Sequence, residues 1–181
     1  MSDASPPQPA KLVIGIFTKD KELAGPVVRQ LIEQFGPVDI AGSWMTFNYT
    51  EYYRPEMGAP LFRKMFSFRR LIAQSALPDI KTVTNSIEKQ YCVDNKRRVN
   101  IDPGYMLPSR FVLATGKDYS HRIYIGKGIY ADLTLMYTKG GFKKLPWTYP
   151  DYADQSILSY LIMVRKKYLF DYKNKFSGKI K

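Results

Sequence analysis

A nearly continuous apolar run, KLVIGIFT, occupies Lys11–Thr18, directly after a Pro- and Ser-rich N-terminal segment. The β-branched residues and the lack of polar alternation predict a strand that is buried on both faces. A chain of 181 residues is long enough for one domain with one sizeable core around such a strand.

A helix is expected next, because apolar residues recur at helical spacing after the first strand. Asp20 could cap its start and Gly36 follows its end, while Pro26 places the start near residue 25 or kinks the helix. A second strand is expected within Asp39–Asn48. Strand, helix and strand in this order predict a βαβ or split βαβ opening. No glycine-rich turn follows the first strand, which removes the usual dinucleotide fingerprint.

The middle of the chain gives weaker signals. Residues 49–60 read as a loop, and the period of Leu61–Ile72 fits either a strand or an amphipathic segment. A short helix is expected over Thr82–Asp94, with Thr84 as its candidate N-cap. A strand is expected over Arg98–Ile101.

Turn chemistry marks Asp102–Tyr105, where Pro and Gly are adjacent, and a short helix is expected over Pro108–Thr115. A hairpin is predicted from His121–Ile125 and Ile129–Thr138, joined by Gly126-Lys127-Gly128. A long helix near residues 153–170 ends the pattern.

These elements predict a single-domain α/β or α+β fold, with a mixed β-sheet flanked by helices and a C-terminal helix packed across it. We expect residues 1–10 to be a disordered N-terminal segment, residues 11–170 the globular domain, and residues 171–181 a basic C-terminal tail. Hydrophobic content of 45% and aromatic content of 14% fit a globular chain.

No apolar run approaches the ~18–20 residues that a membrane-spanning helix needs. The first ten residues have neither the charge nor the apolar stretch of a signal peptide. Cys92 is the only cysteine, so an internal disulfide is excluded. A cytoplasmic location is the simplest expectation.

The formal net charge is +12, and residues 165–181 supply half of it with seven basic residues and one acidic residue. A basic helix end and tail would attract nucleic acid, anionic lipid or an acidic partner. The alternative is a solubilising tail whose basic side chains favour a helix C-terminus.

Several chemistries are excluded by composition. With one histidine, His121, and one cysteine, the chain cannot build a zinc site of several Cys or His ligands. The Gly126-Lys127 pair is followed by glycine, so it does not complete a phosphate-binding P-loop. No GxSxG elbow of a serine hydrolase is present.

Three segments mix charged and polar residues with aromatic rings, Gly and Pro: Lys96–Tyr105, His121–Tyr137 and Leu145–Tyr152. This mixture predicts a basic, aromatic-walled pocket for a phosphorylated small molecule or nucleotide, since arginine grips phosphate and aromatic rings stack on bases. The candidate ligand-binding residues are Arg97, Arg98, Asn100, Tyr105, Arg122, Tyr124, Lys127, Trp147 and Tyr149.

If a reaction follows binding, His121 is the candidate general acid or base, with Asp102 and Asp132 for proton transfer or metal positioning. Glu51 or Glu56 could join Asp102 at a Mg²⁺ site. No other cofactor is indicated, and whether the chain is an enzyme stays open.

Structural roles compete with each of these assignments. The cations could serve ion pairs, Asp132 could pair with Arg98 or Arg122, and the segment around Trp147 could plug the core under the last helix. Two other functions also compete: a noncatalytic RNA-associated protein, which would use the basic charge and the tyrosines, and a protein–protein interaction domain.

The segments KRRVNIDPGY (96–105), HRIYIGKGIYADLTL (121–135) and LPWTYPDY (145–152) resemble those of an uncharacterised bacterial family, domain-of-unknown-function family 4416. The segments FGP (35–37) and YYRPEMG (52–58) are also similar. The resemblance extends from Lys11 to about Tyr168 and implies a stand-alone bacterial domain. It carries no established activity, and the basic tail lies outside it.

Overall fold

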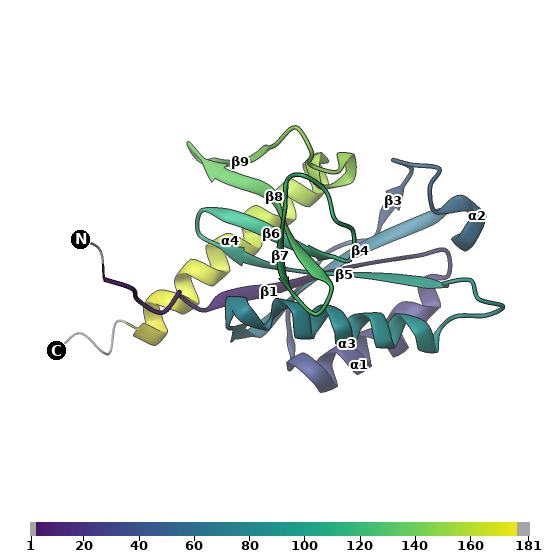
Figure 1. Ribbon diagram of the computed structural model, residues 1–181, viewed down its shortest axis with the longest axis horizontal. Coiled ribbons are helices and arrows are strands. Elements are labelled where there is room, and N and C mark those ends of the chain that lie inside the picture. Colours follow the sequence, from purple (N-terminus) through teal and green to yellow (C-terminus); the bar gives the residue numbers. More distant parts are fainter. Residues whose placement is uncertain (1–2, 177–181) are drawn as a thin grey trace.

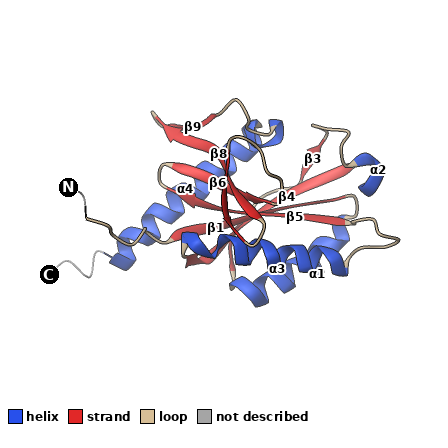
Figure 2. Ribbon diagram, viewed as in Figure 1, coloured by secondary structure: helices blue, strands red, loops and turns tan. Residues whose placement is uncertain are grey.

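The computed structural model describes residues 3–176, in which nine strands form one sheet with helices on both of its faces (Figures 1 and 2). The strands are β1 (Ala10–Thr18), β2 (Val38–Ala41), β3 (Met45–Phe47), β4 (Leu61–Ile72), β5 (Val99–Leu107), β6 (Arg110–Thr115), β7 (Arg122–Gly126), β8 (Ile129–Thr138) and β9 (Gly141–Lys144). The helices are α1 (Ala24–Phe35), α2 (Arg54–Met57), α3 (Leu77–Gln90) and α4 (Gln155–Phe176), with 3₁₀ turns η1 (Lys21–Leu23), η2 (Gln74–Ala76) and η3 (Pro150–Ala153).

The strand order is β2-β4-β1-β5-β6-β8-β7, with β3 also against β4 and β9 against β8. Each pairing among the described strands is antiparallel. Because β1 and β2 are both antiparallel to β4, which lies between them, they run parallel to each other. This is the split form of the predicted βαβ opening. The predicted class is confirmed as an α+β domain whose sheet is flanked by helices, one of them C-terminal.

Strand β1 is buried along its whole length, as its apolar run predicts. Leu12, Ile14 and Ile16 belong to the core shared with α1 and α3, whereas Val13 packs in the core under α4. Figure 1 shows α1 and α3 side by side on one face of the sheet and α4 crossing the other. Pro26 lies in the first turn of α1, where its missing N–H breaks no helical hydrogen bond.

The expected start of the third helix was wrong. Helix α3 begins at Leu77, with Pro78 in its first turn, rather than near Thr82. Thr84 does not cap it: the side chain is buried and its hydroxyl donates to the carbonyl of Lys81 at 3.0 Å. Residues 49–60, expected as a loop, contain the short helix α2, and the ambiguous segment that follows is the long strand β4.

Two expectations around β5 and β6 were also wrong. Asp102–Tyr105 is not a turn but part of β5, and residues 110–115 of the expected helix form β6. The connection between the two strands is the two-residue turn Pro108-Ser109, since Leu107 pairs with Arg110. The predicted hairpin of β7 and β8 is confirmed.

Helix α4 continues to Phe176, so residues 171–176 of the expected basic tail extend this helix, while residues 177–181 lie outside the described residues. At the other end of the chain, the Pro9 carbonyl accepts a hydrogen bond from the Tyr168 hydroxyl at 2.6 Å. Among the described helices, none is long and apolar enough to cross a membrane.

Candidate functional site

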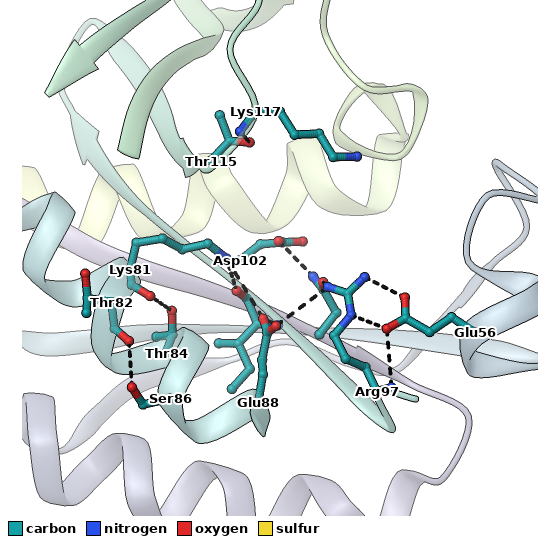
Figure 3. Close-up of polar contacts among 12 residues, drawn as sticks. Glu56, Lys81, Thr82, Thr84, Ser86, Glu88, Arg97, Asp102, Thr115 and Lys117 are labelled. Carbon is teal, nitrogen blue, oxygen red and sulfur yellow. Dashed lines mark hydrogen bonds and ion pairs between the residues drawn. The ribbon is translucent and has the colours of Figure 1, made fainter. Parts of the chain in front are cut away.

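Strands β5 and β6 pair only over a short stretch, from Gly104–Leu113 to Leu107–Arg110. Beyond it they separate, and residues 99–103 of β5 have no strand partner on that edge within the described chain. Figure 3 shows polar side chains from several elements gathered at this point of separation. We call this group, with Arg97, Asn100 and Asp102 at its centre, the β5 polar cluster.

Helix α3 satisfies the backbone of β5 where the strand partner is missing. The Ile101 N–H donates to Glu88 Oε1 at 2.6 Å, and Lys81 Nζ donates to the Ile101 carbonyl at 2.8 Å. Both side chains are buried. Burial raises the pKa of Glu88, and the nearby charges of Lys81 and Arg97 oppose that rise.

A chain of hydrogen bonds runs along the other face of β5. Arg97 Nη1 donates to Asn100 Oδ1, and Asn100 Nδ2 donates to Asp102 Oδ1, both at 2.8 Å. Glu56, on α2, accepts from Arg97 Nε and Nη2, both at 2.7 Å. This bidentate pair lowers the pKa of Glu56. Asp102 therefore lies in a fixed orientation, with 24% of its side chain exposed.

Beneath Asp102 lies a buried arginine. Arg63 Nη2 donates to Asp102 Oδ2 at 3.2 Å, and Arg63 also forms an ion pair with Asp151 of η3. Its guanidinium carbon lies 5.2, 5.1 and 4.8 Å from the ring centroids of Phe17, Phe47 and Tyr152. An arginine stacked in this way and flanked by two carboxylates keeps its charge although it is removed from water.

Asp151 Oδ2 and the Tyr152 hydroxyl are both buried beside the Arg63 guanidinium, and Asp151 Oδ2 forms the ion pair with Arg63 Nη1. Burial raises the pKa of the Asp151 carboxyl, and Arg63 opposes part of that rise. Burial also raises the pKa of the Tyr152 hydroxyl.

A second group of polar residues lies on β7 and β8. Arg122 and Asp132 are on the same face of the sheet as the β5 polar cluster, whereas His121 also lines the opposite face beside Ile123 and Leu133. Arg122 Nε donates to Asp132 Oδ2 at 2.9 Å, and Arg122 Nη2 donates to the Tyr149 hydroxyl at 2.7 Å. His121 Nε2 lies 3.4 Å from Asp132 Oδ2, and its ring stacks on Trp147 with centroids 5.0 Å apart. Asp132 thus pairs with Arg122, as one structural alternative predicted.

The segment 145–153 connects the two groups. Trp147 Nε1 donates to the Leu133 carbonyl at 2.8 Å, and Thr148 Oγ1 donates to the Thr134 carbonyl at 2.6 Å, which holds the segment along β8. At the end of the same segment, Asp151 forms its ion pair with Arg63. Segment 145–153 therefore packs along β8, which is a structural role, and it also contributes the Asp151 carboxylate to the buried cluster around Arg63.

The structure brings together most of the residues predicted as a site. Arg97, Asn100 and Asp102 lie in the β5 polar cluster. His121, Arg122, Asp132, Trp147 and Tyr149 form the second group.

Four other predicted residues lie elsewhere. Arg98 pairs with Asp20 at 3.0 Å, and Lys127 pairs with Asp79 at the start of α3. Tyr105 packs on the opposite face of the sheet, in a core cluster with Leu77. Tyr124 is exposed and contacts the ring of Tyr130.

The described residues contain no group of three or more His, Cys, Asp or Glu side chains that could hold a metal ion. Glu51, one predicted partner of Asp102 at a Mg²⁺ site, pairs with Arg54 at the surface. Glu56 is held by Arg97.

Sequence reasoning missed Arg63, Glu88, Lys81 and Asp151. Arg63 did carry a signal, because it alternates with Leu61 and Met65 and so occupies the buried face of β4. A charged residue on an apolar strand face needs a buried partner. Glu88 and Lys81 carried no such signal, since a helix normally presents such residues to solvent.

A helix-flanked antiparallel sheet with a buried ionic cluster between two of its strands defines a compact α+β domain with a polar site on the α4 face. Residues 8–168 match the family described as Domain of unknown function (DUF4416), and the chain belongs to that family. This confirms the resemblance read from the sequence motifs. No curated protein and no solved structure matches the chain.

Proposed function

We propose that this protein binds a phosphorylated small molecule or a nucleotide where β5 and β6 separate. The observation that carries the proposal is the position of Lys117, which lies across this opening from Asp102 and Arg97 (Figure 3). Within the described chain no carboxylate pairs with Lys117, and its ammonium lies 4.2 Å from the ring centroid of Tyr52. An exposed ammonium without a carboxylate partner is available to an anionic group.

Arg97 would supply the second contact to a phosphate. Its guanidinium has five N–H groups. Three of them donate to Glu56 and Asn100, and Nη1 also lies 3.6 Å from Glu88 Oε2, so the second N–H of Nη2 is left for a ligand. Glu56 holds the guanidinium in one orientation, which reduces the entropy lost when a ligand binds. Arg97 is also partly exposed at the same opening.

Aromatic residues border the same region and would contact the rest of the ligand. Tyr149 is exposed and its hydroxyl accepts a hydrogen bond from Arg122, and the ring of Tyr52 lies beside the Lys117 ammonium. Rings of this kind stack on bases and sugars. A cytoplasmic location, where such metabolites occur, belongs to this proposal.

Any reaction on the ligand is a further step of the proposal. Asp102 is the carboxylate that Asn100 and Arg63 orient while leaving it partly exposed, so it is the first candidate to accept a proton. The roles predicted for His121, Asp132 and Mg²⁺ stay predictions.

The direct test begins with the purified protein. Mass spectrometry of released small molecules would identify a bound phosphorylated compound, and calorimetric titration with ATP, ribose 5-phosphate and inorganic phosphate would follow. We expect Lys117→Gln to weaken binding by roughly tenfold, the effect of losing one charge-assisted contact. Lys143→Gln, an exposed lysine on β9, is the matched control. Equal affinity in Lys117→Gln and the parent protein would contradict the proposed position of the anion.

One surface favours the alternative of RNA association. Lys21 and Lys64 lie 5.8 and 5.4 Å from the ring centroid of Trp44, so two cations flank one aromatic ring near the β2 edge. Binding to single-stranded RNA that weakens steeply with salt, and further in Lys21→Gln/Lys64→Gln, would support this alternative. Binding unchanged by both substitutions and by salt would exclude this surface. A protein–protein interaction role stays a prediction.

A further inference from the structure

A groove lies on the opposite face of the sheet from the β5 polar cluster, over β6, β8 and β7. It has a volume of about 290 Å³, and its apolar wall consists of Tyr105, Val112, Ile123, Ala131 and Leu133. Helix α4 packs against the other face of these strands, which carries Phe111 and Leu113. The groove therefore lies on the opposite face from the Lys117 site proposed above, and the contacts proposed there for the phosphate use none of the residues of its apolar wall.

A single arginine lines one end of the groove. Arg110, the first residue of β6, is exposed, and its guanidinium has neither a hydrogen bond nor an ion pair with any described residue. In this it differs from Arg97, Arg98 and Arg122, each of which pairs with a carboxylate of the chain. Arg110 is thus free to pair with a carboxylate that comes from outside.

His121 lines the other end of the groove. Its ring is fixed between Tyr119 and Trp147, with centroid distances of 6.1 and 5.0 Å. In the sheet Arg110 is opposite Met136, and Arg122, the residue after His121, is opposite Asp132. His121 is therefore level with Leu133, three residues from Met136 along β8, or roughly 10 Å at the rise of a strand.

We propose that this groove binds a small carboxylic acid with an apolar body, of the size of a medium-chain fatty acid. The carboxylate would form a bidentate pair with Arg110, and the hydrocarbon would lie over Val112 and Leu133 toward His121. The groove lies at the small end of the range of ligand sites, ~300–1,000 Å³, which suits a ligand of this length. One unpaired cation beside an apolar wall matches one negative charge on an apolar molecule.

The test uses the full chain labelled with ¹⁵N, titrated with octanoate below its micelle concentration and, separately, with octanol. We expect octanoate to shift amide signals of β6 and β8 and to bind at least about tenfold more tightly than octanol. Arg110→Gln should weaken octanoate about tenfold and leave octanol unchanged. Arg29→Gln, at an exposed position of α1, is the matched control and should change neither affinity.

Ile123→Glu adds a second line of evidence. Ile123 is 69% exposed, so the fold should tolerate the change, while the new carboxylate would repel octanoate and exclude its chain. The proposal is overturned if octanol binds as tightly as octanoate, if Arg110→Gln or Ile123→Glu binds octanoate like the parent protein, or if octanoate shifts no amides of β6 and β8. The phosphate affinity of Lys117→Gln, measured separately, tests the other site alone.

Discussion

Glu88 accepts a hydrogen bond from the backbone N–H of Ile101 at 2.6 Å, in the place where a neighbouring strand would offer a carbonyl. A side chain of α3 thus accepts the hydrogen bond that a neighbouring strand would otherwise accept, at the position where β5 and β6 separate. The opening in the sheet therefore persists without an unsatisfied buried backbone group at Ile101.

Replacing Glu88 should change how stability depends on pH. Burial raises the pKa of Glu88 above its ordinary value of 4.5, so the folded state binds this proton more tightly than the unfolded state. Its contribution to the free energy of unfolding therefore falls as pH rises from the ordinary to the raised pKa, and is constant outside that window. We expect urea denaturation at a series of pH values to show this fall in the parent protein and not in Glu88→Gln. The exposed α1 variant Glu33→Gln should follow the parent, and parallel curves for parent and Glu88→Gln would contradict the raised pKa.

Removing the buried arginine should destabilise the fold strongly. Arg63→Met leaves Asp102 and Asp151 without their shared cation, and breaking such a buried pair costs about 3–5 kcal/mol. Urea denaturation measures this loss. Arg54→Met is the control, because its pair with Glu51 is exposed and contributes about 0–1 kcal/mol.

A second substitution separates charge from packing. Arg63→Met/Asp151→Asn removes one of the two carboxylates that Arg63→Met leaves without a cation, and it should recover part of the stability lost in Arg63→Met. Equal stability of the single and double variants would show that Asp151 is already neutral without Arg63.

Gly104 should not tolerate alanine. A Cβ at this position would lie 2.5 Å from the Val112 carbonyl oxygen, so β5 and β6 would have to move apart. We expect Gly104→Ala to lower the free energy of unfolding by about 1–3 kcal/mol, the usual effect of overpacking. Gly116→Ala is the matched control, because no atom lies within 4 Å of its Cβ position. Equal loss in both variants would mean that the close approach of the strands is not the cause.

The indole N–H of Trp147 should contribute measurably to the docking of segment 145–153. Trp147→Phe keeps a ring beside His121 but removes the hydrogen bond to the Leu133 carbonyl, at a cost of about 1 kcal/mol. Thermal denaturation and limited proteolysis within residues 145–153 would both detect this loss. Trp44→Phe serves as the comparison, since its N–H has no hydrogen bond to another described residue.

Short-range patterns were enough to predict β1, the β7–β8 hairpin and the last helix, because each is encoded in consecutive residues. The turn expected at Asp102–Tyr105 was wrong for a reason that is not local. The N–H and carbonyl of Ile101 face the strand edge toward α3. Pro103, two residues further, faces the same edge, where no strand requires an N–H from it. Glycine is needed at position 104 because the Val112 carbonyl oxygen occupies the space that a Cβ would fill. Proline and glycine thus fit a strand here only because of its neighbours.

The candidate site divides in the same way. Asn100 and Asp102 alternate along β5, so their proximity could be predicted, whereas the residue expected beside them was Arg98 and the structure places Arg97 there. Arg63 and Asp151 meet beside them only through the packing of β4 and η3, which no local pattern encodes. The pairing of Arg98 with Asp20 and of Lys127 with Asp79 is likewise set by tertiary contacts.

The hydrogen bond from Tyr168 to the Pro9 carbonyl joins the last helix to the entry of the first strand. Strand β1 lies inside the sheet, between β4 and β5, and α4 covers one of its faces. During synthesis β1 is made well before α4. The apolar face that α4 covers therefore stays open until α4 has been made, so the domain can reach its native packing only after this helix has emerged from the ribosome.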